Sequence, residues 1–293
     1  MFLLIIAGVV TLATYNFSFQ TLLIKQYLKS LAKNLNTEIS VTNIEVSLFQ
    51  TVTLNDFYIE DLHHDTLLYI NKLAIDIDEF SFKKKKIIVD DVVLTDCFFN
   101  LKNYKDEKES NLAFILDYFS SKDTTSSKSD WVFALNNLEI NKTRFDYDDE
   151  NFEKVISGVD YNHVSLTYLD VSLSSIKLLE KGIDCKIERL KFFEQSGFQL
   201  DNFACNFNIS PAGIITQNLK FSTPYSNVDG NVSFLMKDYA DFGNFIEAVT
   251  IKSTLNSSKI DFNDICYFAP TLNCLNKSLM VEGEVKGKIN NLK

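Results

Sequence analysis

The amino-acid sequence predicts a mostly β protein that is held at a membrane by an N-terminal helix. Apolar and polar residues alternate through most of the chain, most clearly from Leu279 to Ile289. Such alternation places apolar side chains on one face of a pleated strand and polar side chains on the other. It argues against a parallel α/β sheet, because strands that are buried on both faces are apolar throughout. The second observation is an apolar stretch without charge over residues 1–24.

Residues 1–24 are predicted to form a transmembrane anchor. They carry no charged side chain, and Lys25 is the first charged residue of the chain. At ~1.5 Å per residue, a helix of this length spans roughly 36 Å, which exceeds the ~30 Å of a bilayer core. No small-x-small cleavage site follows the stretch, which favours an uncleaved anchor over a signal peptide.

Residues 25–36 are predicted to form an amphipathic helix. Lys25, Lys29 and Lys33 recur every four residues, opposite the apolar residues of the segment, as in a helix with one wet stripe. The same lysines follow the anchor, and the positive-inside rule would place them in the cytoplasm. The lysines therefore leave the orientation in the membrane open.

The body of the chain is predicted to hold two β sections. The first covers residues 37–119 and ends in a short helix at 111–119, and the polar, low-complexity stretch 120–130 is interpreted as a flexible loop. The second covers residues 131–293, with strands separated by turns of Asn, Asp, Ser and Gly and one further helical turn at 261–268. Its last strand has no covering element, so we expect it to continue in a longer chain.

The sequence contains no signature of an enzyme: Gly-x-Ser-x-Gly, a phosphate loop and Gly-x-Gly-x-x-Gly are all missing from it. His63, His64 and Asp65 are interpreted as a solvated turn, because the usual spacing of metal ligands is absent. His163 is expected at the surface. We therefore expect no catalytic residue, no metal and no cofactor. A net charge of −10 argues against nucleic acid as a partner.

The five cysteines are odd in number and form no Cys-x-x-Cys pair, so neither a zinc site nor a disulfide framework is indicated. Cys205 occupies an apolar position of an alternating run, where a free cysteine behaves as a small hydrophobic residue. A disulfide between Cys266 and Cys274 in an oxidising compartment stays open.

Three stretches, taken together, resemble the TamB branch of the AsmA-like proteins of diderm bacteria. They are TEISVTNIEVSLFQTVTLNDFYIEDLHHDTLLYINKLAIDID at 37–78, IERLKFFEQSGFQLDNFACNFNIS at 187–210 and NSSKIDFNDICYFAPTLN at 256–273. The most specific segments are Asp-Thr-Leu-Leu-Tyr and Tyr-Phe-Ala-Pro. The sequence departs from the family pattern at His64, where the turn is expected to hold glycine, and in its missing basic leader.

The resemblance implies a single-pass inner-membrane anchor, a body in the periplasm and a long, curled, antiparallel-type sheet (a β-taco) with one or two short helices. Its concave apolar face would form a groove for phospholipid acyl chains, since apolar burial contributes ~25 cal/mol per Å². The implied role is outer-membrane biogenesis, through phospholipid passage between the inner and outer membranes or through outer-membrane protein assembly with a β-barrel assembly protein. The alternating runs supply the groove candidates Phe203, Cys205, Phe207, Ile209, Val281, Val285 and Ile289.

The competing hypothesis is an anchored structural scaffold, such as a β-sandwich, that binds no lipid. In a scaffold, the apolar faces of the strands pack on each other. Period-two alternation predicts an apolar face in both cases and does not distinguish a covered face from an open groove.

Overall fold

The computed structural model describes residues 20–47, 51–81, 83–122, 132–179, 181–269 and 277–292. The described chain is mostly β, and its strands form a large mixed sheet that does not close. It divides into two compact units. Unit 1 comprises Met1–Lys154 and Asp160–Leu169, and unit 2 comprises Val155–Val159 and Asp170–Lys293.

The anchor expected over residues 1–24 lies almost entirely outside the described residues, which begin at Gln20. Helix α2 (Gln20–Leu35) occupies the region of the expected amphipathic helix and starts before Lys25. Its buried stripe consists of side chains three or four residues apart, and its lysines are exposed, as an amphipathic helix requires. The stripe is Ile24, Leu28, Leu31 and Leu35. Within the described ranges, no helix is both long and apolar enough to cross a membrane.

The sheet of unit 1 contains long strands joined by short turns. Its strands are β1 (Ile39–Ser40), β2 (Asn43–Val46), β3 (Thr51–Glu60), β4 (Thr66–Ser81), β5 (Lys86–Asn103) and β6 (Val132–Asp149). Strand β7 (His163–Leu179) begins in unit 1 and continues in unit 2. Strands β1 and β2 both pair with β3, and β3, β4 and β5 follow one another as antiparallel neighbours.

An antiparallel-type sheet was expected, but β5 and β6 run parallel, so the sheet is mixed. The chain leaves the end of β5, passes through helix α3 (Ala113–Lys122), and returns to the start of β5, where Val132 pairs with Lys86. A parallel neighbour needs a crossover connection of this length, whereas an antiparallel one needs only a hairpin. The predicted flexible loop at 120–130 falls within this connection, and residues 123–131 lie outside the described part.

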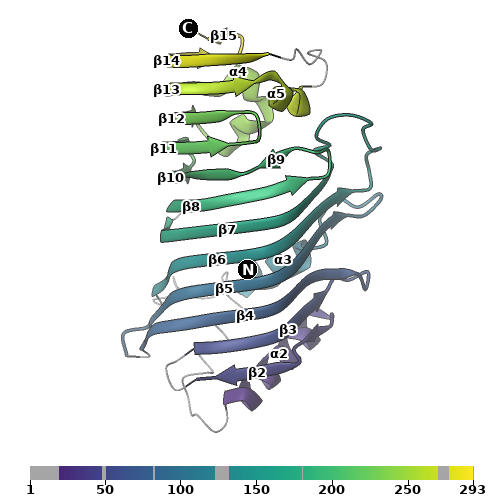
Figure 1. Ribbon diagram of the computed structural model, residues 1–293. Coiled ribbons are helices and arrows are strands. Elements are labelled where there is room, and N and C mark those ends of the chain that lie inside the picture. Colours follow the sequence, from purple (N-terminus) through teal and green to yellow (C-terminus); the bar gives the residue numbers. More distant parts are fainter. Residues whose placement is uncertain are drawn as a thin grey trace. The chain divides into compact units, whose positions relative to one another are not determined.

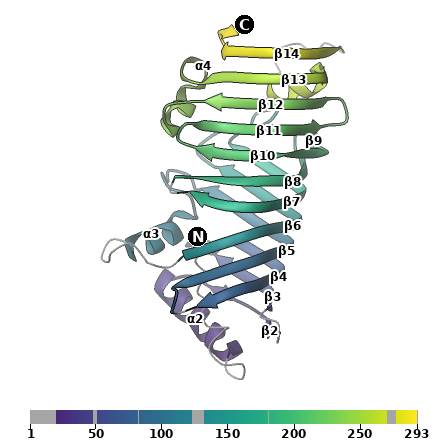
Figure 2. The ribbon, with the colours of Figure 1, turned by 90° about the vertical axis from the view of Figure 1, so that its left-hand side faces the viewer.

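The apolar side of this sheet, which we call the inner face, is buried most deeply at β3. Its β3 side chains are Val52, Leu54, Phe57 and Ile59, and Phe57 is 0% exposed. Helices α2 and α3 lie on one side of the sheet (Figures 1 and 2) and contact each other, Asn34 donating to the Tyr118 hydroxyl. Helix α2 contacts β1 and β2, so its buried stripe covers the β1–β3 end of the inner face.

The strands of unit 1 bend where residues with positive φ interrupt the alternation. Asp56 in β3 and Asp96 in β5 both have φ 52°, and Lys142 in β6 has φ 54°. They occupy adjacent positions across the sheet, as the pairing of the residues just before them shows. Asn55 and Thr95 both pair with Lys72 of β4, and Thr95 also pairs with Asn141. We call Asp56, Asp96 and Lys142 the bend line.

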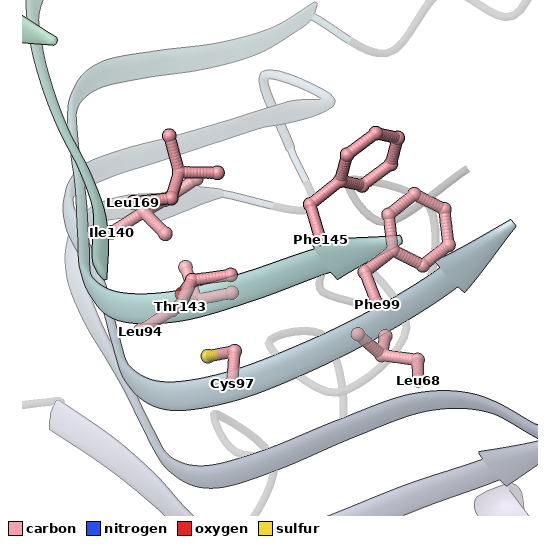
Figure 3. Close-up of a pocket in the computed structure, with 8 residues that line it drawn as sticks. All are labelled: Leu68, Leu94, Cys97, Phe99, Ile140, Thr143, Phe145 and Leu169. Atoms are coloured by element: carbon pink, nitrogen blue, oxygen red, sulfur yellow. The ribbon is translucent and has the colours of Figure 1, made fainter. Parts of the chain in front are cut away.

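At the bend line each strand directs two consecutive side chains away from the inner face. The inner-face side chains are therefore three residues apart there, as with Leu94 and Cys97 in β5 and with Ile140 and Thr143 in β6. An extra residue of this kind, as in a β-bulge, bends a strand and increases its local twist. Figure 3 shows β5 and β6 curving around the space into which these side chains point.

Unit 2 is an antiparallel meander with short helical segments between its strands. Its strands are β8 (Gly182–Glu194), β9 (Gln199–Leu200), β10 (Asn202–Ser210), β11 (Gly213–Ser222), β12 (Asn227–Leu235), β13 (Thr250–Asp261), β14 (Ser278–Lys288) and β15 (Asn291–Leu292). The pairing order is β8, β10, β11, β12, β13, β14 and β15, with β9 paired to β8.

The helical segments of unit 2 are η2 (Tyr239–Asn244), α4 (Phe245–Ala248) and α5 (Phe262–Phe268). Helix α5 confirms the helical turn expected at 261–268, and the Asp261 side chain caps it by accepting from the Asn263 backbone N–H. The segment of η2 and α4 was not expected, so the described helices outnumber the one or two short ones predicted. Segments this short carry too few turns for an apolar period to be recognised.

Candidate functional site

A pocket of about 210 Å³ lies on the inner face of unit 1, beyond the part that α2 covers. Side chains from four strands line it, and Figure 3 shows them on the concave side of the sheet. They are Leu68, Leu94, Cys97, Phe99, Ile140, Thr143, Phe145 and Leu169. Engineered apolar cavities of only ~150 Å³ bind benzene or xenon, so this pocket has room for part of an aliphatic chain.

Strand register explains why these side chains share one face. Leu68 is the Cα partner of Phe99, and Phe99 is the Cα partner of Phe145. Leu94 is likewise the partner of Ile140. Residues that lie directly opposite each other on neighbouring strands point to the same side of a sheet. The pocket is therefore a continuation of the inner face that forms the core at β3.

The pocket differs from that core in its exposure to solvent. Phe57 and Ile70, on β3 and β4, are fully buried, whereas Phe99, Ile140 and Phe145 are only partly buried. The exposure of the inner-face side chains increases with distance from α2, which contacts β1 and β2. Large apolar side chains thus remain accessible in a concave surface on β5 and β6, which is the usual character of a binding site for apolar ligands.

Cys97 and Thr143 are the pocket's non-hydrocarbon side chains, and both are buried. Burial raises the pKa of the Cys97 thiol to about 11, although the nearby Thr143 hydroxyl acts in the opposite direction. The thiol is therefore protonated at neutral pH and is a poor nucleophile. The Thr143 Oγ1 atom is buried, and the polar group beside it is the Cys97 thiol, a weak hydrogen-bonding partner.

The groove candidates on β10 lie on the apolar face of unit 2. Phe207 pairs with Thr216, and the same row continues across the sheet through Val232 and Ser253 to Val285 on β14. Candidates more than seventy residues apart in sequence, Phe207 and Val285, therefore share one face. Val281 also belongs to this face, because it lies four residues from Val285 in the same strand and is the partner of buried Ser258.

The candidates differ in how deeply they are buried. Cys205 belongs to a small buried cluster with Cys185, Ile187 and Leu219, and Phe203 and Phe207 pack against this cluster. Ile209, Val281 and Val285 are partly buried. Ile289 is 45% exposed and lies in the turn after β14, because the strand ends at Lys288. The alternation therefore extends one position beyond the strand that it predicts.

The apolar face of unit 2 is interrupted by polar side chains and partly covered by its own chain. Thr216, Ser253 and Ser258 are buried on it. At one end, Phe245 of α4 contacts Phe234 of β12, with ring centroids 5.6 Å apart. This face is consequently less apolar and better covered than the pocket on unit 1.

His163 was expected at the surface, and that expectation is wrong: the residue is 5% exposed. The turn before β7 folds Asp160 back, so that His163 Nδ1 lies 2.9 Å from Asp160 Oδ2. On its other side, Nε2 lies 3.5 Å from Asp148 Oδ1. Local turn geometry buries the ring between two carboxylates, which the polar sequence around it does not reveal. Among the described residues, no group of three or more His, Cys, Asp and Glu side chains is arranged to hold a metal ion.

The stretch with His63, His64 and Asp65 is a turn between β3 and β4, with both histidines exposed. Beside it lies a buried polar cluster centred on Asp61, which is 1% exposed. The Asp61 side chain accepts hydrogen bonds from the backbone N–H groups of His63 and Asp65, the Tyr104 hydroxyl and Asn111 Nδ2. Burial and the hydrogen bonds to the Asp61 and Asp65 carboxylates raise the pKa of the Tyr104 hydroxyl. The cluster pairs its own polar groups and fits a structural role.

Three cysteines of the described part, Cys97, Cys185 and Cys205, are free and buried. Cys266 is disulfide-bonded. The sequence left open a disulfide between Cys266 and Cys274, and Cys274 lies outside the described residues. The chain therefore combines buried thiols with at least one oxidised cysteine.

The residues of the unit 1 pocket were missed at the sequence level because they lie where the period of two breaks. In Leu94-Thr-Asp-Cys97 and Ile140-Asn-Lys-Thr143, the inner-face residues are three apart. The recurrence of an apolar residue followed by two polar ones was the signal that could have found them. Chemically, the pocket presents an apolar surface, which suits the binding of an apolar ligand. Comparison of the chain with protein-family models, curated proteins and solved structures gives no match.

Proposed function

We propose that this chain binds phospholipid acyl chains on the apolar faces of its strands, as a membrane-anchored periplasmic protein of the AsmA/TamB kind. In this role it serves outer-membrane biogenesis, by phospholipid passage between the inner and outer membranes or by outer-membrane protein assembly. The observation that carries the proposal is the pocket on unit 1, where Phe99, Ile140 and Phe145 form a concave apolar surface.

Acyl chains suit this surface for an energetic reason. Each buried methylene contributes ~0.8 kcal/mol, so a chain segment that fills the pocket gains several kcal/mol without any polar contact. The partly buried phenyl rings of Phe99 and Phe145 gain further burial from the same ligand. Passage of a lipid along such a surface needs no acid, base or metal.

The proposed compartment is supported by the disulfide bond of Cys266, because disulfides persist in oxidising environments such as the periplasm. A reporter that is active only in the periplasm, fused after Asn36, is expected to be active. Activity of a reporter that works only in the cytoplasm, fused at the same residue, would contradict this orientation.

A structural scaffold remains the second candidate, and one observation in unit 2 favours it. Phe245 of α4 packs on Phe234, so the chain itself covers part of the apolar face there. A scaffold needs such self-covering, whereas a groove needs an accessible surface. The partly buried pocket of unit 1 favours the groove.

Photocrosslinking tests the proposed function directly. The full chain is mixed in detergent micelles with a phospholipid that carries a diazirine in one acyl chain, irradiated, and analysed by peptide mass spectrometry. We expect adducts on the peptides that contain Phe99 and Phe145. Adducts confined to side chains on the outer face of the sheet, or no adducts at all, would support the scaffold instead.

A further inference from the structure

We propose that unit 1 docks on a bilayer with anionic phospholipid headgroups through a basic surface at one end of its sheet. This basic surface comprises Lys25 and Lys29 of α2 and the four consecutive lysines Lys83–Lys86. The inference rests on the proposed function, because it requires residues 1–24 to hold the chain at a membrane. It adds the charge of the headgroups that the anchored chain meets.

The first argument is the distribution of charge along the chain. The protein carries 39 acidic and 29 basic residues, yet its first acidic residue is Glu38. Helix α2 therefore carries only basic charges, and its Lys25 and Lys29 side chains are exposed. Basic residues directly beside a membrane anchor are attracted to anionic headgroups, so the position and the charge of α2 point to the same partner.

The second argument is the turn between β4 and β5. Lys83–Lys85 are exposed in this turn, and β5 begins with Lys86. The Glu79 carboxylate lies 3.0 Å from Lys84 Nζ and 2.8 Å from Lys86 Nζ. Together with Asp78 and Glu79, the turn holds two acidic and four basic residues. It therefore keeps a net positive charge in a protein whose total charge is negative.

The third argument is the position of the turn relative to α2. Strand β3 begins at Thr51, which pairs with Asp76, and β4 continues to Ser81, so the turn projects beyond the start of β3. At the other end of β3, the Thr37 hydroxyl donates to the Glu60 carbonyl and fixes the chain just after α2. The helix also contacts β2, and Figure 1 shows its start nearer than its end to the turn. The turn thus lies towards the end of α2 that follows the anchor segment.

A bilayer fits this surface better than an acidic protein does. The start of α2 follows directly on the anchor segment, so a bilayer is beside these lysines whenever the anchor is inserted, whereas an acidic protein would have to be recruited. Lysine side chains suit a headgroup layer, because the long aliphatic stem lets the ammonium group reach polar surroundings. The net charge of −10 repels an anionic surface at long range, so close approach requires a local basic surface.

Lysine labelling of the full chain tests the proposal. The protein is incorporated into nanodiscs of phosphatidylcholine, alone or mixed with phosphatidylglycerol, treated with a limiting amount of an amine-reactive ester and analysed by peptide mass spectrometry. We expect labelling of the basic surface to fall about threefold to tenfold in the anionic discs. High salt is expected to reduce the difference, because it screens surface charges. Lys105 and Lys108 are the internal control, since they are exposed and follow the opposite end of β5.

Two matched variants test whether the lysines act together. Lys83→Gln combined with Lys85→Gln removes two charges from the turn and keeps both ion pairs of Glu79. We expect this variant to weaken the protection of the α2 lysines in anionic discs about threefold. Lys105→Gln combined with Lys108→Gln removes the same charge from the opposite end and is expected to leave that protection unchanged. Equal effects of the two variants would show a general charge effect and overturn the basic surface.

The outcomes separate this inference from the proposed function. Equal labelling of the basic surface in both kinds of nanodisc overturns the docking and makes an acidic protein the alternative partner. Acyl-chain crosslinking in the unit 1 pocket is measured separately and stands or falls by itself. Failure of the chain to enter either kind of nanodisc overturns the anchor and the docking together.

Discussion

Phe99 and Phe145 face each other across the parallel pair of β5 and β6, with their ring centroids 5.7 Å apart and their ring planes tilted by 49°. Aromatic pairs at this separation contribute ~0.5–1.5 kcal/mol beyond the burial of their area. The pair forms one wall of the unit 1 pocket, so the parallel pairing that creates it also creates the site.

Alanine at Phe99 is therefore expected to reduce lipid crosslinking to the pocket severalfold. Phe98 offers a matched control on the same strand, because its ring lies on the other face, where the Arg144 guanidinium carbon is 5.4 Å from the ring centroid. Both substitutions remove a partly buried phenyl ring, at a cost of about 1–3 kcal/mol of stability. Crosslinking yield at equal protein concentration is the measurement. Equal losses for Phe98→Ala and Phe99→Ala would show that the site lies elsewhere.

A charge on the apolar face of unit 2 separates groove from scaffold. If Phe207 and Val281 face acyl chains, Phe207→Glu and Val281→Asp accumulate normally, melt within a few degrees of the wild type and lose bound lipid. In a closed core, an unpaired buried charge is strongly destabilising instead. Asn206→Glu is the control, since Asn206 is the exposed neighbour of Phe207. Protein level, melting temperature and co-purifying lipid are measured together, and degradation of both charged variants would favour the scaffold.

Asp61 is expected to matter far more for stability than the histidines beside it. Asp61→Ala removes the buried acceptor of four hydrogen bonds, two from the backbone N–H groups of His63 and Asp65 and two from the side chains of Tyr104 and Asn111. The loss is expected to cost on the order of 3 kcal/mol. His63 and His64 are exposed, so their joint replacement by alanine changes the free energy of unfolding by about 0.5 kcal/mol or less and leaves cellular function intact. Urea denaturation compares the variants, and similar midpoints for all of them would contradict the structural role of Asp61.

Asp65 is expected to add a pH-dependent contribution, because it pairs with Lys102 at 2.8 Å. The hydrogen bonds from Lys102 and Tyr104 lower the pKa of its carboxyl group. Since the folded-state pKa lies below the ~3.9 of an unfolded aspartate, the contribution is complete above about pH 4 and is lost as pH falls through the lowered pKa. The side chain is half-exposed, so Asp65→Asn costs only about 0.5–1 kcal/mol at pH 7. If the stability difference between variant and wild type does not shrink in acid, the ion pair is not its cause.

The bend line is testable at Asp96, whose φ of 52° disfavours a branched side chain. Asp96→Val is expected to lower the free energy of unfolding by about 1–2 kcal/mol, because the branched residue strains the left-handed conformation. Asp96→Gly removes that strain and is expected to change stability by less than about 1 kcal/mol. Thr95→Val, one residue earlier on the same outer face, is the control. An Asp96→Val variant as stable as Thr95→Val would show that the strand does not need this conformation.

Sequence alone was sufficient for features that depend on nearest neighbours. Alternation marks the strands of unit 2, and it places Phe203, Cys205 and Phe207 on one side of β10 because successive side chains of a strand point to opposite faces. The spacing of the lysines in α2 likewise predicts which side of that helix stays wet. The alternation of apolar and polar residues continues to Ile289, one residue past the end of β14. The end of a strand depends on the turn that follows it and not on the polarity of the residue.

The tertiary structure decided what depends on residues far apart in the chain. Parallel pairing of β5 and β6 requires the crossover through α3, and no local pattern specifies which strand the returning chain joins. The bend line shifts the alternation by one, so Cys97 and Thr143 reach the inner face only through the register of the surrounding strands. Helix α2 covers the β1–β3 end of the inner face, and Phe99 and Phe145 remain accessible beyond it. Polarity along a sequence predicts that a face is apolar, but only the packing of distant elements decides whether that face becomes core or binding surface.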